Sequence, residues 1–330
     1  MSELLSPQEV QAALDRIATL KAGLNQVLLD QGPVVDRVVT AVLARGHVLL
    51  EGLPGLGKTE LCKGLAQLLA LPFKRIQFTP DLLPGDITGT YVFDGDAKSF
   101  SFRPGPVFAS LVLADEINRS SPKTQSALLE AMQEQRVTVL GTSHVLPSPF
   151  FVLATQNPIE LEGTYPLPEA QLDRFMFRVL VPMVGARTMA AIVRERVRGQ
   201  TPALAPAFDP PALSALFELV DRVHVPHAVA DFIGRLVEAT HPTSGLAPDT
   251  VRRFVRYGAS PRAALALAAS ARAWALSLGR PNVGFDDVRE MAPPVLNHRL
   301  VLAYEAGLEK IDARRIIEAL LAAVPEVARG

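Results

Sequence analysis

The stretch Gly52-Leu53-Pro54-Gly55-Leu56-Gly57-Lys58-Thr59 decides how this chain folds. It fits the pattern of one glycine, four arbitrary residues, and then Gly-Lys-Ser/Thr. Residues 47–51 before it read as a buried strand, and residues 61–71 after it read as an apolar-rich helix. Glycines let the backbone curl so that successive N–H groups point inward, and the following helix adds its positive end. The stretch predicts a phosphate-binding loop, and the alternative is a plain glycine turn.

Each part of this loop has an expected task. The Lys58 amine can reach the outer phosphates as a point charge, and the Thr59 hydroxyl can bind Mg²⁺. The other nucleotide contacts that we expect in and beside the loop are Gly52, Pro54, Gly55, Leu56, Gly57 and Glu60.

The composition restricts the class of protein. A chain of 330 residues is long for one core and suggests two domains, and a net charge of −1 gives no global attraction to nucleic acid or membrane. The single cysteine, Cys62, rules out an internal disulfide and a cysteine-based zinc site. The first residues lack the pattern of a signal peptide, and no apolar run reaches the length that spans a membrane. We therefore expect a cytoplasmic protein without membrane insertion.

Strands and helices alternate in the first half of the chain. Residues 6–44 read as helical, with Ser6-Pro7-Gln8-Glu9 as a capping box. Alternation of strands and helices predicts an α/β core, a mostly parallel sheet with helices on both faces. The candidate strands are 47–51, 73–78, 110–115, 150–155 and 175–181.

Two hairpin signals and a change in amino-acid composition are the remaining features of the chain's organisation. Strand-like residues flank Asp94-Gly95 and, further along, Gly141-Thr142, which are turn signals, and the alternative to inserted hairpins is an ordinary extension of the sheet. After residue 184 alanine- and leucine-rich helices follow, with prolines between them. We expect an α/β core over 1–184, with N-terminal helices and two inserted hairpins, and an all-helical domain over 185–330.

Two carboxylates end the strand of residues 110–115. Ligands of parallel sheets bind beyond the carboxyl ends of the strands, which is the edge where Lys58 also lies. Since adjacent strand residues point to opposite faces, Asp115 and Glu116 should differ in role. We expect Asp115 to hold Mg²⁺ together with Thr59, and Glu116 to orient and polarise a water for attack on the γ-phosphorus.

Further polar residues are candidates for the same chemistry. Asn157 follows the strand of residues 150–155, where its amide would face the water or γ-phosphate, unless Asn-Pro is only a turn. Arg262 lies in the first turn of a helix that begins at Ser260-Pro261, where a cation opposes the helix dipole. Its position therefore favours a bound anion, here the γ-phosphate, and the alternative is an exposed arginine that tolerates a small penalty. Arg174, Arg178 and Arg119 are alternative candidates for stabilising charge in a neighbouring subunit's site, and a salt bridge with Asp173 is the other interpretation of the arginines beside it.

Two other clusters are weaker. His224 and His227 flank a proline and lack an obvious carboxylate partner, which disfavours a metal site. The basic residues Arg252, Arg253 and Arg256 are more typical of a solvated helix face than of a nucleic-acid patch, because no aromatic residues are interleaved with them.

Taken together, the motifs resemble those of the AAA+ ATPases and, among them, the MoxR family. They run in family order over most of the chain. The matching stretches are Gly-Leu-Pro-Gly-Leu-Gly-Lys-Thr (52–59), Leu-Leu-Pro-Gly-Asp-Ile-Thr-Gly (82–89), Phe-Arg-Pro-Gly-Pro-Val-Phe (102–108), Ala-Asp-Glu-Ile-Asn-Arg (114–119), residues 125–134, Ala-Thr-Gln-Asn-Pro (154–158), residues 166–175 and Gly-Ala-Ser-Pro-Arg-Ala (258–263).

The resemblance implies a P-loop NTPase fold with a C-terminal helical lid. It implies ATP and Mg²⁺ as cofactors, with Walker A at Lys58 and Thr59, Walker B at Asp115 and Glu116, sensor 1 at Asn157 and sensor 2 at Arg262. It also implies an arginine finger, best matched by Arg174. The family is associated with hexameric rings, with chaperone-like maturation of proteins, and with partners that carry von Willebrand A domains. Leu29-Asp30-Gln31 stands where the family often has Val-Gly-Gln near the adenine.

The sequence thus predicts Mg²⁺-dependent ATP hydrolysis between subunits, coupled to remodelling of client proteins. One alternative is a nucleotide-gated scaffold with little turnover, which the acid Glu116 and the amide Asn157 disfavour. Another is a subunit of a metal chelatase or of a DNA-acting machine, and the near-neutral charge disfavours DNA.

Overall fold

A five-stranded parallel sheet organises the first half of the chain. The computed structural model describes residues 4–96, 98–157, 163–195, 202 and 204–327. The strands are β1 (Val48–Glu51), β2 (Phe73–Gln77), β5 (Leu111–Asp115), β8 (Phe151–Gln156) and β9 (Phe177–Leu180), in the spatial order β2-β5-β8-β1-β9. Four strands lie within their predicted ranges, and β8 runs one residue further. The predicted α/β fold is confirmed.

The two faces of the sheet are buried by different helices. Alternate strand residues such as Leu50 and Leu113 pack with α1 (Pro7–Val27), α2 (Gly32–Leu43) and α3 (Lys58–Leu68). Their neighbours, such as Leu49 and Val112, pack with α5 (Pro122–Glu134) on the other face. Successive side chains of each strand therefore point into two different apolar clusters, one on each face of the sheet. Because both faces are buried, the strands are continuous apolar runs in the sequence.

The N-terminal helical region consists of two helices, α1 and α2. Ser6 and Glu9 form the predicted capping box at the start of α1. The chain then leaves the helix at Leu28, passes through Asp30 at φ 57°, and restarts at Gly32 with Pro33 in the first turn. Proline is compatible with a helix start but not with its interior, so the break falls where Pro33 requires it.

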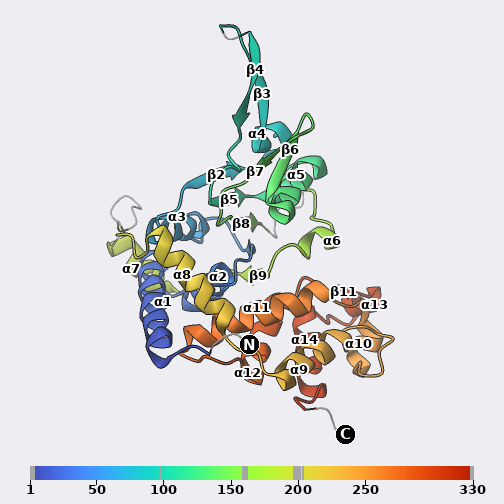
Figure 1. The fold of residues 1–330 in the computed structure, drawn as a ribbon. Helices are drawn as coiled ribbons and strands as arrows, with labels where there is room; N and C mark the ends of the chain where they lie inside the picture. The colour runs from blue at the N-terminus through green and yellow to red at the C-terminus, as the bar shows by residue number, and fades with distance from the viewer. Residues whose placement is uncertain (1–3, 97, 158–162, 196–201, 203, 328–330) are drawn as a thin grey trace.

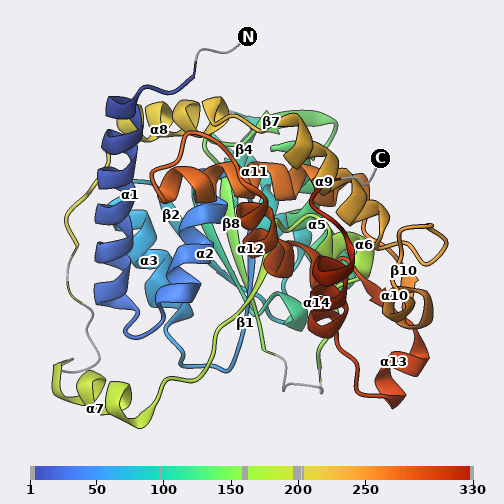
Figure 2. The same cartoon turned by 90° about the horizontal axis from the view of Figure 1, so that it is seen from below.

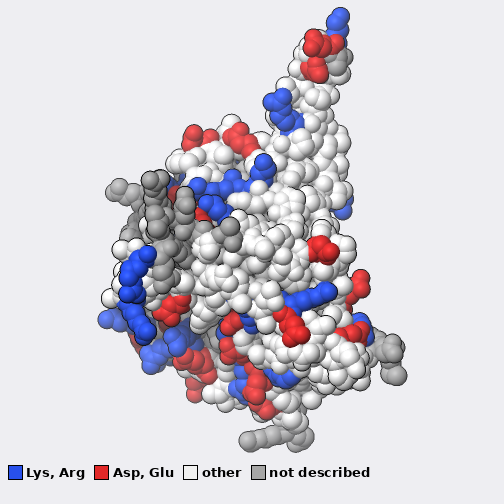
Figure 3. All heavy atoms as spheres, turned by 90° about the vertical axis from the view of Figure 1, so that its left-hand side faces the viewer, with Lys and Arg blue, Asp and Glu red and all other residues white. Residues whose placement is uncertain are grey.

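Both predicted hairpins are present and both leave the sheet. Between α4 (Pro84–Thr88) and β5, strands β3 (Gly89–Asp94) and β4 (Ser99–Pro104) form a long hairpin that projects from the body of the molecule (Figure 1). Acidic and basic side chains gather at its tip (Figure 3). Strands β6 (Arg136–Val139) and β7 (Thr142–Val145) form the second hairpin. Its turn is Leu140-Gly141, both at positive φ, so the prediction of Gly141-Thr142 was wrong by one residue.

The second half of the chain is almost entirely helical. One short antiparallel pair that the sequence did not predict, β10 (Val255–Tyr257) with β11 (Val301–Leu302), interrupts the helices. The first half also contains two short helical segments, the three-residue 3₁₀ helix η1 (Ile117–Arg119) and the helix α6 (Glu169–Leu172). The helices that follow β9 are α7 (Ala186–Glu195), α8 (Pro210–Arg222), α9 (His227–Glu238), α10 (Asp249–Phe254), α11 (Pro261–Ser277), α12 (Phe285–Leu296), α13 (Tyr304–Leu308) and α14 (Ala313–Ala323).

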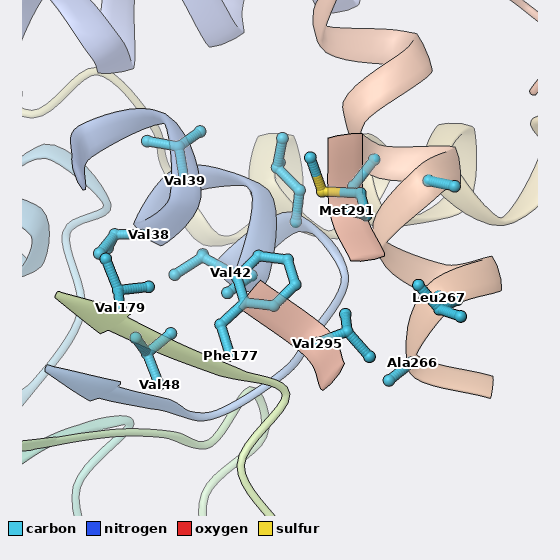
Figure 4. Close-up of a cluster of buried hydrophobic side chains, with 14 of the residues drawn as sticks. Val38, Val39, Val42, Val48, Phe177, Val179, Ala266, Leu267, Met291 and Val295 are labelled. Carbon is cyan, nitrogen blue, oxygen red and sulfur yellow. The ribbon is translucent and has the colours of Figure 1, made fainter. Parts of the chain in front are cut away.

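The helical region shares a core with the edge of the sheet. Seen from below in Figure 2, helices α11 and α12 lie in front of the sheet; α11 packs against α1 and α2, and α12 packs against α11 and β9. Figure 4 shows Val42 of α2 and Phe177 of β9 facing Met291 and Val295 of α12. All four are buried. Because one apolar cluster crosses from the sheet to α11 and α12, these helices are held in a defined place beside β9.

A buried arginine strengthens this junction. Arg299 follows α12, and only 3% of its side chain is exposed. Its Nε donates to Asp173 Oδ1 at 2.7 Å, and the other guanidinium nitrogens donate to the carbonyls of Asp173, Phe175, Met176 and Val295. Burial lowers the pKa of Arg299 from its ordinary value, and the Asp173 carboxylate opposes this shift. One guanidinium therefore ties the helical region to the start of β9.

Candidate active site

A cavity of about 370 Å³ opens where the loop after β1 meets the ends of β2, β5 and β8. It lies beyond the carboxyl ends of parallel strands, where such sheets bind ligands. The residues that line it are Pro54, Gly55, Gly57, Lys58, Thr59, Glu60, Arg75, Asp115, Glu116, Thr155 and Asn157. Nine of the thirteen residues that the sequence nominated therefore lie together: six belong to the loop and the start of α3, and the other three are Asp115, Glu116 and Asn157.

The loop has the geometry of an anion cradle. Gly55 and Gly57 have φ of 81° and 83°, a region that side chains with a Cβ rarely adopt. Gly57 is the N-cap of α3, and a glycine has no side chain that could accept a hydrogen bond from the first N–H groups of the helix. These N–H groups are therefore left without a side-chain acceptor. Unsatisfied N–H groups at a helix start, with the helix dipole behind them, bind phosphate.

Lys58 reaches across its own loop. Its Nζ donates to the Gly52 carbonyl at 2.6 Å. Burial lowers the pKa of the Lys58 amine, while the charges of Asp115, Glu116 and Glu51 oppose the shift. The amine is thus already placed inside the loop, close to three carboxylates that favour its charged form.

Gly52 and Leu56 shape the loop rather than lining the cavity. A Cβ on Gly52 would lie 2.7 Å from the Val181 carbonyl, so this position has no room for a side chain. Leu56 packs against the apolar core instead. The two expected contacts therefore fix the path of the loop, and neither residue lines the cavity in this structure.

Asp115 is buried at the end of β5 and is held on both oxygens. Its Oδ1 accepts a hydrogen bond from Thr155 Oγ1 at 2.6 Å. Its Oδ2 accepts from Arg75 Nη2 at 2.6 Å and from Arg75 Nε at 3.0 Å. Oδ2 therefore already faces a cation, which is the property expected of a metal ligand.

Glu116 lies on the same cavity as Asp115, although strand alternation predicted opposite faces. The strand ends at Asp115, and Glu116 adopts φ 57° and ψ 49°, which turns its side chain back toward the cavity. Its Oε2 accepts from Gln77 Nε2 at 2.8 Å and from Arg119 Nη1 at 3.0 Å. The alternation rule fails here because the second acid is outside the strand.

Thr155 joins the two acids. Besides donating to Asp115, its hydroxyl accepts the Glu116 backbone N–H at 2.8 Å. The next polar position is Asn157, which is 7% exposed and lines the cavity directly after β8. Pro158, expected to end the strand, lies outside the described residues.

The two predicted arginines do not line this cavity. Arg262, half exposed, has Nη1 3.8 Å from Asp173 Oδ2, and the α11 N-cap Ser260 donates to the same carboxylate. The anion that the sequence placed beside Arg262 is thus a side chain of this chain in the present structure. Arg174 lines a separate cavity of about 590 Å³ with Glu130, Glu134 and Arg136, among others.

Three residues of the site were missed from the sequence: Arg75, Gln77 and Thr155. Gln77 is the register partner of Asp115, and Arg75 lies two residues earlier on the same face of β2. The sequence feature that could have indicated Arg75 and Gln77 is Phe73-Lys74-Arg75-Ile76-Gln77, a strand with polar residues at its carboxyl end. Reading it required knowing that β2 lies beside β5.

The donor set fits a magnesium nucleotide. Thr59 and Asp115 offer the hydroxyl and carboxylate oxygens that Mg²⁺ prefers, and Asp115 Oδ2 already carries a positive group. The backbone around Gly55 and Gly57 offers amide donors for phosphates. Both parts lie on one cavity.

A second cavity, of about 330 Å³, lies between α2, β9 and α12. It is next to the phosphate loop, because its wall residue Pro182 follows Val181, whose carbonyl approaches Gly52. Gln31 is 2% exposed and donates from Nε2 to the Pro182 carbonyl at 2.7 Å. Its Oε1 is buried without a hydrogen-bond partner among the described residues.

Comparison with known proteins agrees with this geometry. The chain is 43% identical over 92% of its length to the chaperone MoxR1 of Mycobacterium tuberculosis, covering 81% of that protein. It is also 43% identical over 91% of its length to YeaC, an uncharacterized protein of Bacillus subtilis, covering 92% of it. The chain belongs to the MoxR family of AAA+ ATPases.

Further matches place the MoxR-type parts along the chain. The model of the ATPase family associated with various cellular activities matches residues 47–177, and that of the AAA lid domain matches residues 249–320. A solved structure of a Cytophaga hutchinsonii protein assigned as an ATPase superposes with a TM-score of 0.89 at 37% identity, and the match covers 98% of each chain. This MoxR-family chain is thus an ATPase with a P-loop core and a helical lid, as the sequence predicted.

The weaker clusters bind their own neighbours. Arg252 donates to the Ala247 carbonyl, Arg253 pairs with Glu309, and Arg256 lies over the Tyr257 ring. In the described part of the chain no group of three or more His, Cys, Asp and Glu side chains is arranged to hold a metal ion. The same residues include no helix both long and apolar enough to cross a membrane.

Proposed function

We propose that this ATPase hydrolyses ATP with Mg²⁺ in the cavity at the ends of β2, β5 and β8, and uses the reaction to remodel partner proteins. The observation that carries the proposal is the convergence of Lys58, Thr59, Asp115, Glu116 and Asn157 on one cavity at the start of α3. These residue types are those that phosphoryl transfer to water requires.

Each residue then has a task that its position supports. Amides of the loop from Gly55 onward and the Lys58 amine bind the β- and γ-phosphates. Thr59 and Asp115 would hold Mg²⁺, which neutralises charge on the transferring phosphoryl group. Glu116 orients the attacking water and accepts its proton, because it faces the cavity on a backbone held by Thr155. Asn157 aligns the same water through its amide.

We also propose that adenine occupies the cavity between α2, β9 and α12. Its wall of prolines, Val179 and Leu180 suits an aromatic ring. The unpaired Gln31 Oε1 is an acceptor that the exocyclic amine of adenine would satisfy. The departure of Leu29-Asp30-Gln31 from the usual family triplet leaves this glutamine in place.

We propose that Arg262 reaches the site when the helical region moves, and that Arg174 reaches the site of another subunit when subunits assemble. Arg262 would act as sensor 2 after the helical region, here proposed to begin at residue 185, closes over the γ-phosphate and Arg262 leaves Asp173. Arg174 would act as an arginine finger in the site of a neighbouring subunit of a hexameric ring. The remaining loop contacts, Gly52, Pro54, Leu56 and Glu60, are proposed to shape the phosphate site.

The remodelling role rests on similarity. The relative from Mycobacterium tuberculosis is named a chaperone, and we extend a chaperone-like role to this chain. We further propose a partner with a von Willebrand A domain, no role for nucleic acid, and a cytoplasmic location, which suits the free and buried thiol of Cys62.

ATP turnover by wild type and Glu116→Gln tests the proposal. We expect the wild-type rate per subunit to rise with protein concentration, because a trans arginine requires assembly, and Glu116→Gln to bind ATP with turnover reduced at least about 100-fold. Glu305→Gln, an exposed change on α13, is the control and should match wild type. Near-normal turnover in Glu116→Gln would reject the role of this acid.

The same assay separates the alternatives. A scaffold would bind ATP with negligible turnover at every protein concentration. A DNA-acting machine would show turnover that DNA stimulates and salt suppresses. A pull-down with Glu116→Gln and ATP should retain assembled rings with their partner and client proteins.

A further inference from the structure

Arg75 is a charged residue of the site to which the proposed function assigns no task. It lies on β2, lines the main cavity, and donates through both Nε and Nη2 to one oxygen of Asp115, Oδ2. The other Asp115 oxygen is occupied by the Thr155 hydroxyl. Oδ1 is held by the buried Thr155, whereas both donors to Oδ2 belong to Arg75, so departure of this one side chain would free Oδ2 for a cation.

The same guanidinium also reaches toward Glu116. Arg75 Nη2 donates to Gln77 Oε1 at 2.5 Å, and Gln77 Nε2 donates to Glu116 Oε2 at 2.8 Å. Asp115, Arg75, Gln77 and Glu116 thus form one continuous chain of hydrogen bonds across the ends of β2 and β5. A change in the partner of Asp115 would therefore alter the polar surroundings of Glu116.

Arg75 is held less firmly than Asp115. About half of the Arg75 side chain is exposed, against 12% for Asp115. An exposed arginine can leave such a pair at modest cost, because water replaces the carboxylate as its partner. Arg299 offers a contrast, since its guanidinium is buried and bonded on every side.

We propose that Arg75 is an exchangeable counter-ion of Asp115: it neutralises this carboxylate in the absence of Mg²⁺ and yields Oδ2 when the metal nucleotide binds. This inference rests on the proposed function of the cavity. Without Mg²⁺ Arg75 lowers the repulsion between Asp115 and the phosphates, and with Mg²⁺ it competes for the same oxygen. Arg75 therefore weakens the coupling between Mg²⁺ and ATP binding.

Equilibrium binding in two buffers tests the exchange. The dissociation constant of ATP is measured by calorimetry with excess EDTA and with excess Mg²⁺, for wild type and Arg75→Met. Methionine keeps part of the side-chain length and removes the charge. We expect binding without metal to weaken and binding with Mg²⁺ to strengthen or stay equal, so that the ratio of the two constants grows at least about fivefold.

Two further variants make the result specific. Lys74→Met removes an exposed positive charge from the adjacent position of β2, whose side chain points to the other face, and should leave the ratio at the wild-type value. Arg75→Lys keeps the charge and should remain close to wild type, which provides a second reading if Arg75→Met folds poorly.

The outcomes distinguish this inference from the proposed function. Wild type that binds ATP more tightly with Mg²⁺, together with an unchanged or smaller ratio in Arg75→Met, would overturn the exchange alone. An equal growth of the ratio in Lys74→Met would also overturn it, since the effect would then be that of general charge. Wild type that fails to bind ATP in both buffers would overturn the proposed function and this inference with it.

Discussion

Removal of the Arg299 guanidinium should loosen the junction between the sheet and the helical region. In Arg299→Met the Asp173 carboxylate loses its shortest partner, and three backbone carbonyls near β9 lose a donor. The arginine is 3% exposed and the aspartate 17%, so water reaches these groups poorly. The change leaves the Asp173 carboxylate with its weaker partners only, and it removes a donor from the Asp173 and Met176 carbonyls.

The expected loss follows from burial of that charge. Breaking a buried ion pair from one side costs about 3–5 kcal/mol, because the remaining charge keeps its desolvation penalty. With an unfolding entropy of about 2.1 cal/mol/K per residue, a chain of 330 residues should lose about 4–7 °C in melting temperature. Ser260 and Arg262 also contact Asp173 and will offset part of the loss.

Calorimetric melting of the purified protein measures this loss. The matched control is Arg314→Met, which breaks an ion pair with Glu318 whose side chains are 81% and 62% exposed. Exposed pairs contribute about 0–1 kcal/mol, so the control should melt within about 1.5 °C of wild type. Equal shifts for the two variants would refute the reasoning that burial makes Arg299 important.

Three other predictions concern the core, the long hairpin and the acids. Burial lowers the pKa of His47 to about 4, and its Nδ1 accepts the Val152 N–H, so the ring is neutral in the fold. Between pH 6.5 and 4 the unfolded chain therefore binds more protons, and the free energy of unfolding should fall by up to about 3 kcal/mol as pH is lowered through this window; denaturant titrations that show no greater fall in wild type than in His47→Gln would contradict this. Gly105→Ala should destabilise the protein by about 1–3 kcal/mol, because its Cβ would lie 2.2 Å from the Ile87 carbonyl, whereas Gly85→Ala meets nothing within 4 Å and should change denaturant stability little. Thr155→Val removes the hydroxyl that joins the two acids and should lower the ATPase rate about 10–100-fold, with Thr155→Ser near wild type; equal rates in both variants would exclude a positioning role.

The sheet was predictable from local sequence because each strand is a short apolar run with its own boundaries. Gly52–Thr59 and the strand-ending pair Asp115-Glu116 have similarly local signatures. General rules for parallel sheets then place all carboxyl ends on one edge, although they do not give the order of the strands. These parts of the site needed no knowledge of distant contacts.

The remainder depended on contacts between distant segments. Arg75 is invisible as a site residue until β2 is paired with β5, 40 residues away in the chain. Arg262 looked uncompensated at its helix start, but Asp173 supplies the anion from another element. Glu116 was assigned to the wrong face because a strand rule was applied one residue past the end of β5.

The most direct test of the central claim is the affinity of Mg²⁺-ATP for wild type and for Lys58→Ala, measured by equilibrium titration. Lys123→Ala, an exposed change in the first turn of α5, controls for loss of a positive charge. If the curled loop and its lysine hold the triphosphate, Lys58→Ala should bind at least about 10-fold more weakly than wild type, and Lys123→Ala should equal wild type. Equal affinities in all three proteins, or no binding by wild type, would contradict the account.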